Sequence, residues 1–198
     1  VDARRISAHW YVFMLLVFPV TLAGAVLLSR AAGGSTPELA TLSQIAANPA
    51  LIVGLMVTNM LGGPLSEELG WRGVGLDRLL GRWPPLLASL ITAPIWVAWH
   101  APLFFMEGTS QHAWGLGTAD FWFYVAPIVP LSVLETWCAV KNRRSILAPI
   151  LLHFAYNFAL SVVYPIPMPV FGLTALFLTI AAAGVILVTG LEESESGG

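Results

Sequence analysis

Two adjacent carboxylates and an arginine stand out in the pattern Glu67-Glu68-x-x-x-Arg72. On a helix, residues four apart share a face, so Glu68 and Arg72 can form an ion pair. Glu67 is rotated away from that pair by about a quarter turn or slightly more. The pattern therefore predicts one carboxylate held by a guanidinium and one that is free to act as a proton acceptor.

Two histidines and an asparagine are the polar groups that the free carboxylate could meet. His153 and Asn157 are four residues apart, so on a helix they point the same way. A carboxylate and an imidazole can together activate a water molecule, and a histidine beside an amide can stabilise an oxyanion. The candidate catalytic set is Glu67, His100, His153 and Asn157, with Glu68 and Arg72 as supporting residues.

Each of these residues also has an ordinary structural interpretation. A histidine in an apolar helix more often bonds to a neighbouring helix than takes part in catalysis. His153 and Asn157 could simply join helices, at roughly 1 kcal/mol per hydrogen bond. We expect Glu135 and the basic turn at 141–144 to be interfacial anchors, and His9 and His112 to be loop residues without a role.

A metal site is a further alternative. Zinc held by Glu67, His100 and His153 is chemically possible, because two histidines and a glutamate suit this ion. The chain has no His-Glu-x-x-His motif, the arrangement in which a helix supplies two zinc ligands. We therefore expect neither a metal nor another cofactor.

Composition places the chain in the membrane. It has 198 residues, of which 57% are hydrophobic and only 10% are charged, whereas a soluble domain carries roughly a quarter charged residues. The net charge is -2 and no basic cluster points to nucleic acid, so nucleic acid is not an expected partner. Cys138 is the only cysteine, so an intrachain disulfide is impossible.

The apolar segments predict an all-α, polytopic transmembrane helical bundle. About six spans and a short amphipathic helix are expected. The predicted spans are 10–28, 49–63, 86–106, 119–140, 145–164 and 170–191, and the amphipathic segment is 73–85. The Glu67 segment extends or follows the second span after a Gly62-Gly63-Pro64 break. The first span has a rival interpretation as a cleaved signal peptide, because Ala23-Gly24-Ala25 resembles a cleavage site.

The chain is predicted to form a single transmembrane domain over 1–190, with the motif region at about 60–160 and an acidic, disordered tail at 191–198. Of the nine lysines and arginines, only Arg30 falls on the far side of the six-span arrangement. By the positive-inside rule, the N-terminus, the Glu67 region and the basic turn face the cytoplasm. We therefore expect an integral protein of the cell membrane whose active site opens to the cytoplasmic side.

Three motifs in order resemble those of a known family. They are Glu67-Glu68-x-x-x-Arg72, Trp96-x-x-x-His100 and His153-x-x-x-Asn157. Together they are similar to the motifs of the CAAX protease and bacteriocin-processing family, also called the type II CAAX prenyl endopeptidase or Abi group. The second motif of that family usually begins with Phe, where this chain has Trp96.

The resemblance implies a glutamate-dependent intramembrane endopeptidase that works without a metal. Glu67 would be the general base, His100 its partner on the attacking water, and His153 with Asn157 the oxyanion donors. The implied substrate is a membrane-associated peptide or lipidated protein, such as a prenylated CAAX protein cut near its C-terminus. Some members of the family act instead in bacteriocin immunity or as membrane scaffolds, and that non-enzymatic alternative stays open at this point.

Geometry can separate the two alternatives. Water activation requires the polar atoms of Glu67 and His100 within roughly 6 Å of each other. A separation of more than about 15 Å between Glu67 and His153 would end the enzyme hypothesis, because rotating the side chains could not bring them together. A polar cluster sealed from water and lipid would favour the scaffold.

Overall fold

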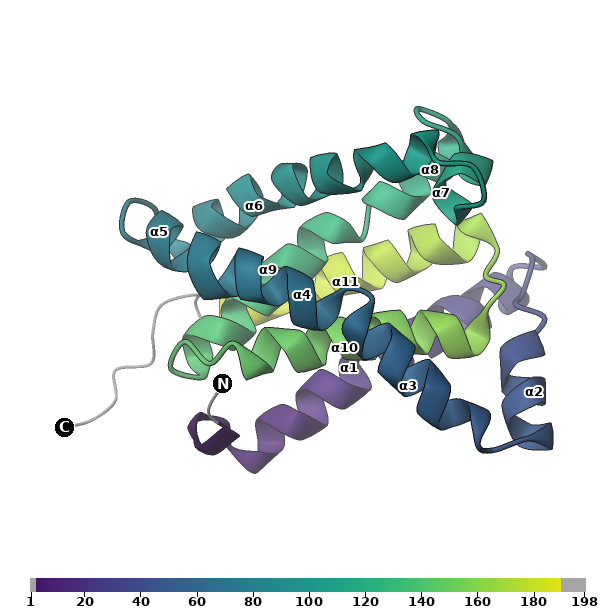
Figure 1. The fold of residues 1–198 in the computed structure, drawn as a ribbon, viewed down its shortest axis with the longest axis horizontal. Coiled ribbons are helices and arrows are strands. Elements are labelled where there is room, and N and C mark those ends of the chain that lie inside the picture. Colours follow the sequence, from purple (N-terminus) through teal and green to yellow (C-terminus); the bar gives the residue numbers. More distant parts are fainter. Residues whose placement is uncertain (1–2, 190–198) are drawn as a thin grey trace.

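The computed structural model describes residues 3–189, and these residues form helices and no strands. Figure 1 shows them as a bundle whose long helices run roughly along one axis. The long or central helices are α1 (Ala8–Ala31), α3 (Leu51–Leu61), α6 (Pro85–His100), α9 (Ile128–Lys141), α10 (Leu147–Val163) and α11 (Met168–Thr189). The predicted all-α transmembrane bundle is confirmed, and the predicted tail at 191–198 lies outside the described residues.

Helices occupy all six segments that were predicted to span. Within residues 3–189, four helical stretches are long and apolar enough to cross a membrane, namely Ala8–Ala31, Pro85–Phe105, Ala119–Lys141 and Met168–Thr189. The stretch Pro85–Phe105 combines α6 with the 3-10 helix η3 (Ala101–Phe105), and Ala119–Lys141 combines α8 (Ala119–Val125) with α9. The remaining two are shorter, because α10 has 17 residues and α3 has 11.

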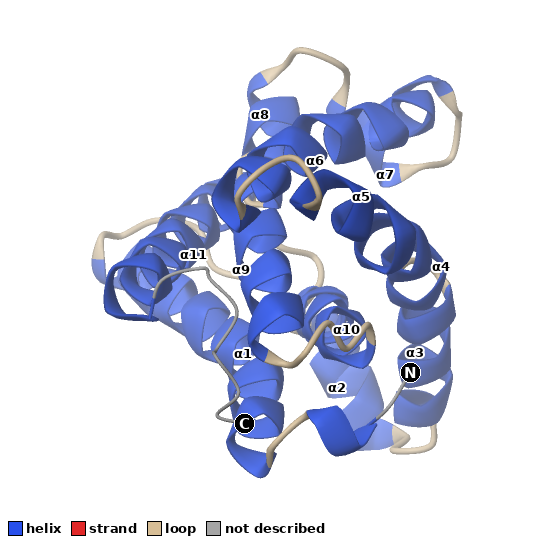
Figure 2. Ribbon diagram, turned by 90° about the vertical axis from the view of Figure 1, so that its left-hand side faces the viewer, coloured by secondary structure: helices blue, strands red, loops and turns tan. Residues whose placement is uncertain are grey.

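The bundle is built around α9. Every residue from Pro130 to Val140 is buried, and the helix packs against α6, α10 and α11. Figure 2 shows α9 near the centre, with these three helices around it. A helix buried all round in a membrane protein has no lipid-facing side, so any ionisable group on it must find its partners inside the protein.

The first span is part of this core. α1 packs against α10 and α11 and buries Met14, Phe18 and Leu22. Its Trp10 also lies against Trp137 of α9, with 4.6 Å between the ring centroids. These contacts favour a structural span over the signal-peptide alternative for this segment.

The basic residues gather at one end of the bundle, as predicted. Arg5 donates to the carbonyl of Arg143 at 3.1 Å, and Arg144 forms a 2.9 Å ion pair with Asp77. Asp77 belongs to α5 (Leu76–Leu80), the short amphipathic helix expected between 73 and 85. The N-terminal segment, α5 and the turn at 141–144 therefore lie together, at the left of Figure 1.

The opposite end holds two short helices in segments that were predicted to lie between the spans. They are α2 (Ala40–Ala47) and α7 (Ser110–Trp114). Thr109 caps α7 by accepting a hydrogen bond from the backbone N–H of His112, and the His112 ring bonds the carbonyl of Phe104. The prediction that His112 is a loop residue is wrong, because His112 lies in the first turn of α7, whose backbone N–H groups the Thr109 hydroxyl helps to satisfy.

Candidate active site

Glu67 and Glu68 lie on α4 (Pro64–Gly70), which follows the break at Gly62 and Gly63. Proline at the first helical position costs no hydrogen bond, so it starts a new helix readily. α4 continues into a wider π-helical turn, η2 (Trp71–Gly75), a kind of turn that is frequent at functional sites. The two carboxylates then point in different directions, because successive helical residues are about 100° apart.

Glu68 forms the predicted ion pair. Its two carboxylate oxygens both lie 3.1 Å from Nη1 of Arg72, and both side chains are buried. Glu67 has a different environment, since it lies at the cavity wall and accepts a 2.7 Å hydrogen bond from Nε1 of Trp96 at Oε2. The expectation of one paired and one unpaired carboxylate is thus met by the geometry.

His153 and Asn157 approach Glu67 from α10. A methyl group on Gly63 would lie 3.2 Å from Oε1 of Glu67, 3.4 Å from Nδ2 of Asn157 and 3.7 Å from Nε2 of His153. These atoms therefore surround one small space, which exists because Gly63 has no side chain. The distances of 3.2 and 3.7 Å are both measured from the position of this methyl group. Glu67 Oε1 and His153 Nε2 are therefore at most about 6.9 Å apart. This is far below the 15 Å that would have ended the enzyme hypothesis.

His100 joins the site through Trp96. Its Nδ1 donates to the carbonyl of Trp96 at 2.9 Å, so Nε2 is the nitrogen left for other partners. Trp96 thus holds Glu67 with its indole and His100 with its backbone, while its ring packs 5.1 Å from that of His153. All four residues of the candidate catalytic set line the same cavity.

Behind the cavity wall lies a buried group of charges, of which only the Glu68–Arg72 pair was predicted. Glu135 was expected to be an interfacial anchor, and this is wrong: the side chain is fully buried at the centre of the bundle. Its Oε2 lies 2.6 Å from Nη2 of Arg72, and its Oε1 lies 3.9 Å from Nδ1 of His153. The missed signal was an ionisable residue in an apolar span, which is costly unless it has a partner.

Three of these side chains also have the makings of a metal site. Ligand atoms of Glu68, Glu135 and His153 all lie within 4.8 Å of one another. The guanidinium of Arg72 contacts both carboxylates, so a cation already occupies the position between them. The grouping also differs from the zinc alternative considered above, because His153 sits with Glu68 and Glu135. The absence of a metal stays a prediction.

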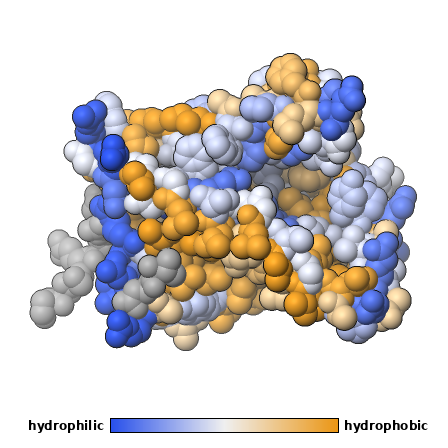
Figure 3. All heavy atoms as spheres, in the orientation of Figure 1, coloured by the Kyte–Doolittle hydropathy of each residue, from blue (hydrophilic) through white to orange (hydrophobic). Residues whose placement is uncertain are grey.

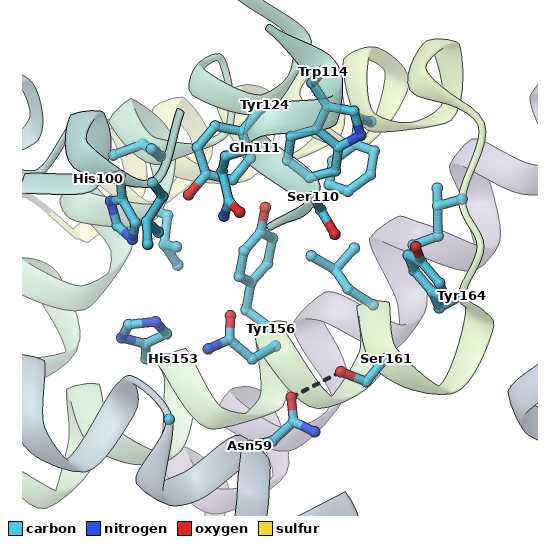
Figure 4. Close-up of a pocket in the computed structure, with 18 of the residues that line it drawn as sticks. Asn59, His100, Ser110, Gln111, Trp114, Tyr124, His153, Tyr156, Ser161 and Tyr164 are labelled. Carbon is cyan, nitrogen blue, oxygen red and sulfur yellow. Dashed lines mark hydrogen bonds between the residues drawn. The ribbon is translucent and has the colours of Figure 1, made fainter. Parts of the chain in front are cut away.

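The cavity has a volume of about 1080 Å³. Figure 4 shows His100 and His153 at one side of it and Ser110, Trp114 and Tyr164 toward the other. In Figure 3 the face seen in Figure 1 is hollowed on its right half. The candidate catalytic set is therefore at the wall of an open space, and it is not sealed inside the bundle.

The lining of the cavity extends toward one end of the bundle. Its lining includes Thr41, Ser110 and Tyr164, which belong to the end opposite the basic residues. Thr41 donates to the carbonyl of Tyr164, so α2 and the segment after α10 meet at this end. Among the described residues that line the cavity, none comes from α5 or the basic turn.

Comparison with known proteins agrees with the geometry. Residues 49–159, more than half of the chain, match the family of type II CAAX prenyl endopeptidases described as Rce1-like. The matched segment runs from the start of the second predicted span to α10, so it includes all six candidate site residues. The chain is also 29% identical, over 147 residues, to CAAX prenyl protease 2 of Methanococcus maripaludis.

That alignment covers 73% of this chain and 53% of the relative, so the chain spans about half the length of the curated relative it matches. With helices long and apolar enough to cross a bilayer, the chain is an integral membrane protein. It belongs to the Rce1-like family of type II CAAX prenyl endopeptidases.

Proposed function

We propose that the protein is an intramembrane endopeptidase that hydrolyses a peptide bond near the C-terminus of a membrane-associated substrate. The observation that carries this proposal is the convergence of Glu67 Oε1, His153 Nε2 and Asn157 Nδ2 on the space beside Gly63. A base and two potential oxyanion donors around one small opening are what acyl transfer to water requires.

In the proposed reaction, Glu67 takes a proton from a water molecule. Its Oε2 is already occupied by the indole N–H of Trp96, so Oε1 is the oxygen that accepts the proton. His100 holds the same water through its free nitrogen. The water oxygen bonds to the carbonyl carbon of the peptide, and the electron pair of the carbonyl moves to its oxygen.

The resulting oxyanion lies against His153 and Asn157. Stabilising charge at the position where it develops is commonly the largest contribution to catalysis of this type. When the tetrahedral intermediate collapses, the carbon–nitrogen bond breaks and the leaving nitrogen takes the proton held by Glu67. The carboxylate of Glu67 is thereby restored, and the products are an acid and an amine.

The proposed substrate is a peptide or lipidated protein, with a prenylated CAAX protein as the first candidate. The hollow face of the bundle (Figure 3) would let a lipid tail stay in the bilayer while the peptide reaches Glu67. The basic end is proposed to face the cytoplasm. The opening of the active site to the cytoplasmic side stays a separate proposal, since the residues that line the cavity extend to the end of the bundle opposite the basic residues.

We also propose that the chain forms one transmembrane domain, since α1 packs on α10, which carries His153 and Asn157, and α11 packs on α1 and α9. The open cavity favours the enzyme over the scaffold alternative, for which a sealed polar cluster was expected.

Glu67→Gln tests the proposal. It should lower cleavage of a matching substrate by about 10²- to 10⁴-fold, the usual contribution of a general base. The assay uses purified protein and a panel of farnesylated and unmodified CAAX peptides. The control is Glu107→Gln, which removes an exposed carboxylate and should leave activity unchanged. Full activity in the Glu67 variant would refute the mechanism.

A further inference from the structure

A polar pair lies on the cavity wall next to the candidate catalytic set. Ser161 follows His153 and Asn157 at the same spacing of four residues, so all three side chains lie on one face of α10. Asn59 approaches Ser161 from α3, and a 2.8 Å hydrogen bond joins the two side chains. Both residues are half-buried and line the cavity, and Figure 4 shows them on the same side of it as His153.

A backbone carbonyl fixes the direction of the hydrogen bonds in this pair. The side chain of Asn59 lies 2.8 Å from the carbonyl oxygen of Leu55, which can only accept, so the atom on that side must be the amide nitrogen Nδ2. Oδ1 of Asn59 is then the atom that meets Ser161, and the Ser161 hydroxyl donates its only proton to it. The pair keeps one acceptor, the oxygen of Ser161, and one donor, the second N–H of Asn59 Nδ2.

A donor and an acceptor side by side match a peptide group, which offers one C=O and one N–H. The cavity lining around the pair includes the apolar side chains of Leu55 and Leu160, from the same two helices. Moving a peptide bond from water into such surroundings costs free energy unless both of its polar groups are bonded. The pair can supply both bonds, since Asn59 Nδ2 can donate to the carbonyl oxygen and Ser161 Oγ can accept from the N–H.

The distance from the catalytic set indicates which peptide group of a substrate would lie here. Ser161 is four residues beyond Asn157, which is a rise of about 6 Å along the helix. An extended chain advances about 3.3 Å per residue, so about two residues of substrate cover this distance. Beyond Ser161, α2 bounds the cavity, because Thr41 lines it and donates to the carbonyl of Tyr164 at 3.4 Å. A bounded end suits a chain that terminates, which is the C-terminal side of the substrate.

We propose that Asn59 and Ser161 form a substrate-binding subsite, which holds the second peptide bond after the scissile bond. The ligand is a backbone peptide group, so the subsite fixes the register of the chain without recognising its side chains. The scissile bond is thereby held at the space beside Gly63. The alternative is that the hydrogen bond only joins α3 to α10, as polar pairs in membrane bundles do. This inference rests on the proposed endopeptidase function.

Backbone esters in the substrate test the contact directly. An ester in place of a peptide bond removes the N–H and keeps the carbonyl. The probes are farnesylated CAAX reporter peptides with one ester at a time, placed at each bond around the cleavage site, which mass spectrometry of the products of the unmodified reporter identifies. The ester effect is the ratio of kcat/KM between the unmodified reporter and the ester reporter.

The expected result is an ester effect that depends on Ser161 at one position. In wild type, the ester at the second bond after the cleavage site should lower kcat/KM by about 3- to 10-fold, as the loss of one hydrogen bond does. Ser161→Ala should cleave the unmodified reporter about 3- to 10-fold less efficiently and lose little more with this ester. Ser161→Thr keeps the hydroxyl and should show the ester effect of wild type.

Three results overturn the inference. An equal ester effect in wild type and Ser161→Ala would leave the pair as a link between helices. A Ser161-dependent effect at a different bond would contradict the register, and so would cleavage at a bond that fewer than two peptide bonds follow. Thr58→Ala, which removes an exposed hydroxyl of α3 outside the cavity lining, is the matched control and should behave as wild type.

Thermal unfolding in detergent shows whether Ser161→Ala folds. If it does not, Asn59→Leu replaces it, because without Oδ1 of Asn59 the Ser161 hydroxyl can turn its proton toward the ester oxygen. The ester effect should then shrink in the same way, and an unchanged effect would again refute the contact. Wild-type protein that cleaves no unmodified reporter would refute the proposed function itself, a result distinct from all of these.

Discussion

Glu67 and Glu68 are neighbours in the sequence, yet they lie in opposite environments. Glu68 is fully buried and is held by Arg72 and His153. Glu67 is partly exposed at the cavity wall, and its carboxylate accepts a hydrogen bond from the indole N–H of Trp96. A turn of about 100° between successive helical residues is enough to give one carboxylate a structural partner and the other access to water. In this bundle, the face of the helix on which a carboxylate lies therefore decides whether it is buried in an ion pair or reaches the cavity.

Removing the Arg72 guanidinium, which holds the buried Glu68, should have the largest effect, a loss of stability. Arg72→Met leaves Glu68 and Glu135 facing each other without a cation, and losing one partner of a buried pair costs about 3–5 kcal/mol. Thermal or denaturant unfolding in detergent measures the loss. Arg82→Met, at an exposed position, is the control and should stay within about 0.5 kcal/mol of wild type. Equal stability of the two variants would show that the cluster is not a structural element.

Filling the space beside Gly63, into which Glu67, His153 and Asn157 point, should lower the rate of catalysis. Gly63→Ala places a methyl group 3.2 Å from Oε1 of Glu67, closer than an ordinary contact. Displacing a catalytic group by about 1 Å can cost 10²-fold, so we expect a 10- to 100-fold loss of kcat with stability nearly unchanged. Gly54→Ala is the control, because its methyl group would meet nothing within 4 Å. Normal activity of Gly63→Ala would place the reaction elsewhere in the cavity.

Removing the hydrogen bond that orients the Glu67 carboxylate should lower kcat by a smaller factor. Trp96→Phe, which introduces the aromatic residue more usual in this motif, removes the N–H bonded to Oε2 of Glu67. A hydrogen bond to a charged group contributes about 1.5–3 kcal/mol, and water at the cavity wall can replace part of it. We expect kcat to fall about tenfold in steady-state assays, with Trp83→Phe unaffected. Cleavage at the wild-type rate would mean that Glu67 needs no fixed orientation.

Cysteine labelling tests on which side of the membrane each end of the bundle lies, and it is expected to affect neither stability nor activity. Cys138 is buried, so it should react little with the reagent, and labelling reports on the introduced cysteine. If the basic end is cytoplasmic, a membrane-impermeant maleimide should label Ser110→Cys in intact cells. It should label Arg78→Cys only after the cells are permeabilised. The reverse pattern would place the cavity end in the cytoplasm.

Most of the helical architecture, and the residues of the candidate site, could be predicted from the amino-acid sequence. A chain with so few charges must bury its backbone in helices to cross a membrane, which predicts the bundle and the approximate segments. The spacing of four residues fixed the Glu68–Arg72 pair and the shared face of His153 and Asn157, because helical geometry is local.

Which groups meet across helices could not be predicted, because these contacts depend on how the helices pack. Glu135 looked like an interfacial anchor because it stands six residues before the basic end of its helix, but the packing of α9 at the centre puts it against Arg72. The direction of the cavity likewise depends on how α2, α7 and the segment after α10 assemble. Periodicity records which face of a helix is polar, whereas the partner of that face is set by packing between segments far apart in the chain.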